Sequence, residues 1–178
     1  MIKVFTYFVE PASYTFDLIN NIHKKLNIQY AFIKDKSEAI SNCSLEHIIV
    51  LSSRSIFSKL YFLYRTWKDY DIIIINGYNN YPFIITFIIN FLSFKKRYIA
   101  IESDTQFKVP ENIIKRTIKY IYLNIIFRNK YILGFAGGSV THKDLFRNYG
   151  MIEKRIFMIP MMIDNKKYYQ KTKKFPDR

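Results

Sequence analysis

Two carboxylates stand one residue apart in the segment YIAIESDT, where a run of apolar residues gives way to polar ones. If the run is a strand, Glu102 and Asp104 point to the same side, because side chains two positions apart share a face. Carboxylates this close perturb each other's pKa, and one of them could act as a base or orient a sugar hydroxyl. A helix cap plus a surface acid would account for the same residues. We take Glu102 and Asp104 as the candidate catalytic pair.

Polar and small residues also follow other predicted strands. In parallel sheets, ligands bind beyond the carboxyl ends of the strands, so these loops are expected to surround one crevice. Two adjacent glycines before a helix let the backbone approach a ligand closely, and helix N-termini favour anions. Loops are polar in general, however, and helix starts favour Ser and Asn as caps, so a structural role explains these residues equally well. The candidate binding residues are Tyr14, Asn76, Gly77, Tyr78, Asn79, Gly137, Gly138 and Ser139.

Several common sites are excluded by missing motifs. The first loop, EPASYT, contains no glycine, so the G-x-G-x-x-G motif of NAD-binding proteins is absent. The chain also lacks a G-x-x-x-x-G-K-[ST] phosphate loop and a G-x-S-x-G hydrolase elbow. His23, His47 and His142 are far apart in the sequence and are expected to be surface or packing residues. We therefore expect neither a cofactor nor a metal.

Strand-like and helix-like segments alternate along the chain, which predicts an α/β fold. It should be an open, mostly parallel Rossmann-like sheet of about seven strands with helices on both faces. The predicted strands are Lys3–Val9, Gln29–Lys34, His47–Ser52, Asp71–Asn76, Tyr98–Ser103, Tyr131–Gly137 and Arg155–Pro160. The predicted helices are Thr15–Leu26, Ser55–Tyr70, Tyr81–Phe94, Glu111–Lys130 and Val140–Gly150.

Three of these helices are strongly apolar. Tyr81–Phe94 is shorter than the roughly 20 residues of a membrane span and is predicted to be buried. In the next helix Ile114, Ile118, Ile121, Ile125 and Ile126 form a stripe, with Lys115, Arg116 and Lys119 on another side. In the helix Ser55–Tyr70 and just before it, aromatic and basic residues alternate: Phe57, Tyr61, Tyr64 and Trp67 with Arg54, Lys59, Arg65 and Lys68. We expect the stripes to pack on the sheet; contact with a membrane surface is the alternative.

Length and charge set the broad class. The 178 residues suffice for one well-buried domain rather than two. The formal net charge of +14, from 28 Lys and Arg against 14 Asp and Glu, indicates either an anionic partner or a solvated Lys-rich surface. Cys43 is the only cysteine, which excludes an internal disulfide and fits a reducing cytoplasm. The N-terminal residues predict a strand rather than a signal peptide, so a cytoplasmic protein is expected.

The last quarter of the chain has a recognisable order of elements. A predicted strand is followed by Gly-Gly-Ser, a helix ending in NYGM, the strand entry EKRIF, and then IPMMIDNKKYY. This order resembles the end of the N-terminal domain in GT-B-fold glycosyltransferases of the large retaining class. Leu145–Gly150, Glu153–Pro160 and Asp164–Tyr169 fit that template, and YIAIESDT resembles the family's strand into its active-site loop.

The resemblance implies transfer of a sugar from a nucleotide sugar to an acceptor hydroxyl, with retention and without a metal. Residues 1–164 would form the acceptor-binding N-terminal domain, and residues 165–178 an interdomain linker or the start of a missing C-terminal domain. The family's second domain carries the nucleotide-sugar pocket and an E-x7-E motif, so this chain alone is expected to be inactive. Many relatives have a Gly-rich first loop; EPASYT departs from it, which speaks against donor contacts there.

The implied partners are a nucleotide-sugar donor and a glycan or lipid-linked acceptor of surface-polysaccharide synthesis. Glu102 and Asp104 would face the acceptor or the donor sugar. Tyr14, Asn76, Gly77, Tyr78 and Asn79 would bind the acceptor, and Gly137, Gly138 and Ser139 would line the cleft floor on the phosphate side. Relatives often act on lipid-linked acceptors, so peripheral contact with the inner membrane face is part of this expectation.

Two other classes remain open. The first is a standalone basic α/β module that binds a phosphorylated or nucleic-acid ligand. The basic residues are spread over many elements without a compact basic arm, so we do not expect nucleic acid as the partner. The second is a response-regulator-like switch, which would need clustered acids after the first strand; Glu10 alone does not supply them.

Overall fold

The sheet contains six strands in the computed structural model, which describes residues 2–12, 15–16, 18–19, 28–35 and 49–159. All neighbouring strands are parallel, in the order β2-β1-β3-β4-β5-β6. This confirms the predicted open, Rossmann-like α/β sheet. The strands are β1 (Val4–Phe8), β2 (Ile28–Phe32), β3 (Ile72–Asn76), β4 (Tyr98–Ser103), β5 (Ile132–Gly137) and β6 (Ile156–Ile159).

The predicted strand at His47–Ser52 lies partly outside the described residues. Within them, Val50 forms a single parallel bridge with Phe32. The N–H of Phe32 donates to the carbonyl of Ile49, and the N–H of Leu51 donates to the carbonyl of Phe32, both at 2.8 Å. Since β1 occupies the other side of β2, the bridge marks a seventh position at this edge.

Four helices are described after β2. Their bounds are α3 (Ile56–Asp69), α4 (Tyr81–Leu92), α5 (Ile113–Arg128) and α6 (Val140–Asn148), and a short 3-10 turn, η1 (Glu153–Arg155), precedes β6. A side chain that accepts hydrogen bonds from the first turn caps each helix: Ser55, Asn80, Asn112 and Ser139. These caps satisfy backbone N–H groups that have no partner inside a helix and so fix where each helix begins.

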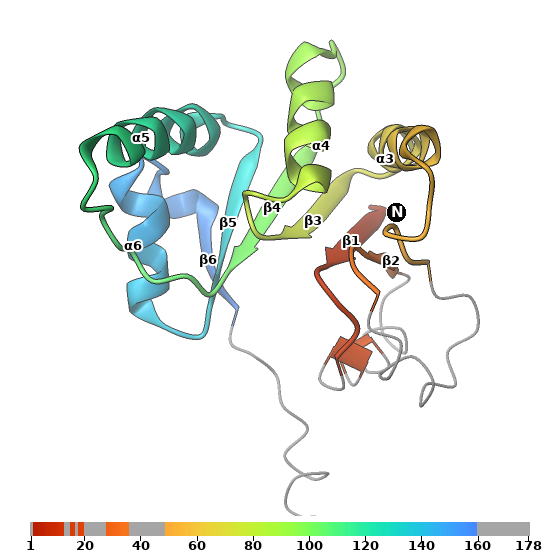
Figure 1. The fold of residues 1–178 in the computed structure, drawn as a ribbon, viewed down its shortest axis with the longest axis horizontal. Coiled ribbons are helices and arrows are strands. Elements are labelled where there is room, and N and C mark those ends of the chain that lie inside the picture. Colours follow the sequence, from red (N-terminus) through yellow and green to blue (C-terminus); the bar gives the residue numbers. More distant parts are fainter. Residues whose placement is uncertain (1, 13–14, 17, 20–27, 36–48, 160–178) are drawn as a thin grey trace, which may run out of the picture.

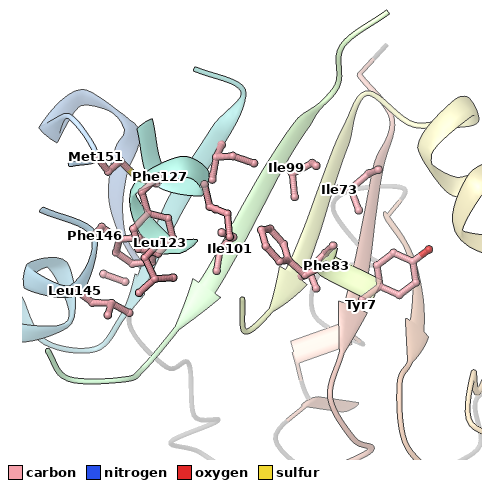
Figure 2. Close-up of a cluster of buried hydrophobic side chains, with 14 of the residues drawn as sticks. Tyr7, Ile73, Phe83, Ile99, Ile101, Leu123, Phe127, Leu145, Phe146 and Met151 are labelled. Carbon is pink, nitrogen blue, oxygen red and sulfur yellow. The ribbon is translucent and has the colours of Figure 1, made fainter. Parts of the chain in front are cut away.

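Each face of the sheet has its own apolar cluster. The larger cluster joins Phe5 and Tyr7 of β1 to side chains of α3, α4, α5 and α6, and Figure 1 shows α3, α4 and α5 along one side of the sheet. Figure 2 shows Phe127 and Leu123 of α5 beside Leu145 and Phe146 of α6; the rings of Phe127 and Phe146 are 5.1 Å apart. On the opposite face Phe8 of β1 packs with helical residues and β2. Phe8, Phe16, Ile19 and Phe32 form this second cluster. Helical residues therefore lie against both faces, as predicted, and on the second face those that the structure describes lie beside β1 and β2.

The expectation that the apolar stripes of α3 and α5 are buried holds for Trp67 and Ile126 and is wrong for the other members. Phe57 is 83% exposed and Ile118 is 62% exposed. The other buried residues are Leu63 and Thr66 on α3, and Leu123 and Phe127 on α5. Both helices are apolar on more than one side, so contacts with neighbouring elements decide which side is buried. The stripe members that remain exposed are Phe57, Tyr61, Tyr64, Ile114, Ile118, Ile121 and Ile125.

Helix α4 is also only half buried, which corrects the prediction of a buried helix. Pro82, Phe83, Thr86 and Asn90 are buried. The exposed apolar residues on and just after α4 are Ile84, Ile88, Phe91, Leu92 and Phe94. Among the described residues, no helix has the length and apolar character needed to cross a membrane.

A buried amide fixes α4 against α3 and the start of β4. Asn90 Oδ1 accepts hydrogen bonds from Trp67 Nε1 at 3.0 Å and from the N–H of Arg97 at 2.7 Å. Its Nδ2 donates to the carbonyl of Arg97 at 3.1 Å. Because this one side chain joins two helices and a strand entry, it sets the spacing of the helical layer.

Candidate functional site

A crevice of about 470 Å³ lies beyond the carboxyl ends of the strands. It opens at the end of β1, which lies between β2 and β3. The next strand in the sequence, β2, lies on one side of β1, and the later strands lie on the other, so the strand order reverses here. This is the position at which open α/β sheets bind ligands. Its lining comes from four of the predicted loops and the end of β2: Phe8, Val9, Glu10, Thr15, Ile33, Lys34, Asn76, Gly77, Tyr78, Asn79, Asn80, Glu102, Ser103, Asp104, Thr105 and Gly137.

The loop after β3 is built around a glycine in the left-handed region. Gly77 has φ +84°, a conformation that other residues rarely adopt. Its N–H donates to the carbonyl of Glu102 at 2.8 Å, which joins the ends of β3 and β4. Asn80 then begins α4 by accepting from the N–H of Phe83 at 3.0 Å. Asn79 is exposed between these two fixed points and lines the crevice.

Tyr78 lines the crevice but is held from behind by α5. The hydroxyl of Tyr122 donates to the carbonyl of Tyr78 at 2.6 Å. The Tyr78 ring meets Phe127 edge to face at 6.2 Å, and burial raises the pKa of its hydroxyl. The ring of Tyr78 is therefore part of the crevice wall. A ligand could stack only on the area of the ring that Phe127 does not cover.

Glu102 and Asp104 lie in different surroundings. Glu102 is within β4 and is partly buried, whereas Asp104 follows the strand and is exposed. Burial, and then the charge of Asp104, raises the pKa of Glu102 above its ordinary value. The predicted coupling between the two carboxylates is present, and burial is the larger cause. Glu102 also reaches a second, largely apolar hollow of about 160 Å³ that is lined by Phe8, Ile19 and Phe135 among others.

Asn76 presents an unsatisfied acceptor at the same place. Asn76 and Glu102 are register partners on adjacent parallel strands, so their side chains share a face. Asn76 Oδ1 is buried and has no hydrogen-bond donor among the described residues. A buried oxygen without a donor is unfavourable by about 1–3 kcal/mol, and a ligand that supplies an O–H or N–H would relieve this.

The glycine pair after β5 only partly reaches the crevice. Gly137 lines it, and a Cβ added to Gly137 would lie 3.5 Å from Asp104 Cβ. Gly138 and Ser139 are not among the lining residues. The N–H of Gly138 donates to the carbonyl of Ile159 and that of Ser139 to Gly137. The Ser139 hydroxyl caps α6. The part of the prediction that assigned phosphate contacts to these groups therefore gains no support.

Most of the predicted site residues converge in the crevice. Those that line it are Asn76, Gly77, Tyr78, Asn79, Glu102, Asp104 and Gly137. Tyr14 lies outside the described residues, as do residues 160–178, which include the predicted linker. Sequence reasoning missed Lys34, the last residue of a predicted strand, and Thr105, which directly follows the predicted site residue Asp104. Thr105 is fixed by its N–H, which donates to Ser103 Oγ at 3.2 Å.

The described residues contain no cluster of three or more His, Cys, Asp or Glu side chains suited to a metal. His142 on α6 instead contacts the carbonyl of Gly137 through Nδ1. This is a packing role for His142, as predicted. It also holds the end of β5 at the crevice.

Comparison with known proteins adds no relative: no protein-family model, no curated protein and no solved structure matches this chain. The α/β fold follows from the structure itself. The glycosyltransferase resemblance stays a prediction that depends on the motifs described above.

Proposed function

We propose that the crevice binds a polyhydroxylated sugar acceptor. The observation that carries this proposal is the pairing of an unsatisfied Asn76 Oδ1 with the half-buried carboxyl of Glu102 on the same face. Both groups accept hydrogen bonds, and Asp104 and Glu10 add further carboxylates to the lining. A sugar offers several O–H donors in a compact ring, which matches a crevice rich in acceptors.

In this proposal the chain is the acceptor-side half of a nucleotide-sugar-dependent glycosyltransferase. The acceptor oxygen forms a bond to the anomeric carbon of the donor sugar, the bond from that carbon to the diphosphate breaks, and the hydroxyl proton is released. Ionised Glu102 can accept the hydrogen bond of the reacting hydroxyl. A carboxyl with a raised pKa is also the better base of the two. The donor would be held by a second domain, and the reaction would take place in the cytoplasm, at the inner membrane face when the acceptor is lipid-linked.

The alternative, a module for phosphorylated ligands, finds less support in the crevice. Glu10, Glu102 and Asp104 line it together with a single base, Lys34. The carboxylates of Glu102 and Asp104, when ionised, repel a phosphate at short range. The basic residues that give the chain its net charge therefore lie mainly elsewhere.

Saturation-transfer NMR tests the proposal, with neutral oligosaccharides, nucleotides and a short oligonucleotide offered separately. We expect neutral sugars to bind and Glu102→Gln or Asn76→Ala to weaken that binding by at least about tenfold, or about 1.4 kcal/mol. Glu111→Gln and Asn148→Ala are matched controls, because both residues are exposed and lie outside the crevice. Preferential binding of nucleotides or the oligonucleotide, or unchanged sugar binding in both crevice variants, would reject the proposal.

A further inference from the structure

The outer side of the helical layer is unusually apolar. The outer side of a surface helix is ordinarily polar. Here most of the large apolar side chains that are exposed among the described residues lie on α3, α4 and α5. We call this set the outer helical face: Phe57, Leu60, Tyr61, Tyr64, Ile84, Ile88, Phe91, Leu92, Ile113, Ile114, Ile118, Ile121 and Ile125.

The first half of α5 is the most exposed part of this face. Every residue from Ile113 to Ile118 is exposed, Lys119 is partly buried, and the first fully buried residue is Leu123. Exposed Ile114, Ile118 and Ile121 recur at helical spacing and so form one stripe. An isoleucine stripe without a partner is unfavourable in water, by roughly 25 cal/mol for each Å² of apolar area that could be buried.

Cations lie on these helices too, with Lys68 beside Tyr64 on α3 and Lys115 beside Ile118 on α5, each at helical spacing. A hollow of about 440 Å³ at the start of α5 is lined by Lys108, Lys115 and Lys119, with Glu111 as the acid among them. Arg116 lies on the same exposed turn. On α3 the basic residues are Lys59, Arg65 and Lys68. Among the residues of α3, α4 and α5, the one acid is Asp69, which already pairs with Arg65 at 3.2 Å.

We propose that the outer helical face docks on a bilayer that contains anionic lipids. Isoleucine, phenylalanine and tyrosine would enter the boundary between headgroups and acyl chains, while the flanking Lys and Arg side chains contact lipid phosphates. Each basic residue near an anionic surface adds to the attraction. The charge of the face is complementary to such a surface.

The same charge disfavours the other occupants. A second copy of the chain that used the same face would bring Lys68 and Lys115 against identical cations, and Asp69 is the one acid of α3, α4 and α5 that could neutralise them. A nucleic acid would satisfy these cations but would leave the isoleucine stripe in water, because phosphate contacts bury little apolar surface. A bilayer satisfies both requirements at once.

Helix α5 of the docking face also supports one wall of the crevice, although none of its residues lines the crevice. The loop that carries Glu102 and Asp104 continues through Lys108 to the start of this helix, and Tyr122 of α5 holds the carbonyl of Tyr78. Figure 1 shows α5 alongside β4 and β5, the strands that it connects. The docking inference stands without the sugar-binding proposal, since it depends on α3, α4 and α5 alone.

Vesicle flotation tests the inference, with the full chain and vesicles of phosphatidylcholine either alone or mixed with phosphatidylglycerol. We expect flotation with the anionic vesicles and little with the neutral ones. Ile118→Gln combined with Ile121→Gln removes apolar contact without changing charge, and Lys115→Gln combined with Arg116→Gln removes charge. Each pair should lower the partition coefficient by at least about tenfold.

Ile152→Gln combined with Lys154→Gln is the matched control, because both residues are exposed and lie away from α3, α4 and α5. Thermal melting of each variant confirms that the fold is retained. Equal flotation on neutral and anionic vesicles, or equal losses in the control and in the α5 variants, would overturn the inference. So would a dimer, seen by light scattering, that Ile118→Gln with Ile121→Gln dissociates, since a second copy would then be the occupant.

Discussion

Replacing Gly134 by alanine should destabilise the chain, because α6 lies directly against this glycine. Gly134 is in the middle of β5 and pairs with Ile101 and Ile156. A Cβ built there would lie 2.8 Å from Phe146 Cδ1 and 2.9 Å from Met151 Sδ. Carbon atoms in contact are ordinarily about 3.5–4.0 Å apart, so both neighbours would have to move.

The neighbours have little room to do so. Phe146 is fully buried and packs against Phe127 at 5.1 Å, and Met151 is 4% exposed. Overpacking of this kind costs about 1–3 kcal/mol. Alanine also restricts the unfolded chain, which offsets about 0.4–1 kcal/mol of that loss. We therefore expect a net loss of about 1–2 kcal/mol, or roughly 2–8 °C in Tm for a chain of this size.

Two neighbouring glycines provide the controls. At Gly137 the added Cβ would make ordinary contacts of 3.5 to 3.7 Å with Asp104 and Ser103, so stability should change little. At Gly138 the space is open but φ is +78°, so backbone strain alone should cost about 1–2 kcal/mol, without any overpacking. Differential scanning calorimetry should rank Gly134→Ala and Gly138→Ala below Gly137→Ala. If the Tm of Gly134→Ala equals that of Gly137→Ala or exceeds that of the parent, α6 does not approach β5 as closely as the structure indicates.

Three further predictions concern ionisable and buried polar groups. Burial raises the pKa of Glu102, so the folded chain binds the carboxyl proton more tightly than the unfolded chain does. The free energy of unfolding should therefore fall as pH rises from the ordinary carboxyl pKa through the raised one. In urea titrations Glu102→Gln should be more stable than the parent at neutral pH, and the difference in stability should disappear in acid. Arg147, followed by Lys143, lowers the pKa of Glu153 to about 2. Glu153→Gln should therefore lose a small, salt-screened stabilisation at neutral pH, and this loss should shrink as pH falls toward 2 and vanish below it. A loss of equal size at neutral pH and in strong acid would contradict this prediction. Asn90→Ala should lower stability by about 2–3 kcal/mol, because it leaves the buried N–H of Trp67 without an acceptor; a change below about 0.5 kcal/mol would refute that role.

The strands were the most predictable part of the structure. DIIIIN is a continuous β-branched run, and β3 occupies Ile72–Asn76 of it. Such runs are typical of parallel strands covered on both faces. The buried side of α5 was not predictable, because isoleucines occur on several sides of that helix. Leu123 and Phe127 were selected by their contacts with α6, which lies later in the chain.

Part of the site was predictable because the strands that end beside it were. The rule that ligands bind beyond the carboxyl ends of parallel strands identified Asn76, Glu102 and Gly137, and all three line the crevice. The pairing of Asn76 with Glu102 depends on the register of β3 against β4, which tertiary packing sets and no local pattern records. Ser139 followed the same sequence rule, but its hydroxyl serves the helix that it begins.

The net charge of +14 is unevenly distributed, with an acidic crevice and a basic helical layer. Glu10, Glu102 and Asp104 line the crevice, whereas Lys and Arg residues of α3 and α5 lie on the helices that form the outer helical face. A basic chain whose carboxylates collect where the strands end cannot be using its excess charge to hold a ligand in that place. The charge is free to act at a distance, on the approach and orientation of the chain at an anionic surface. If docking and sugar binding both hold, raising the salt concentration should weaken vesicle binding and leave the affinity of a neutral sugar unchanged.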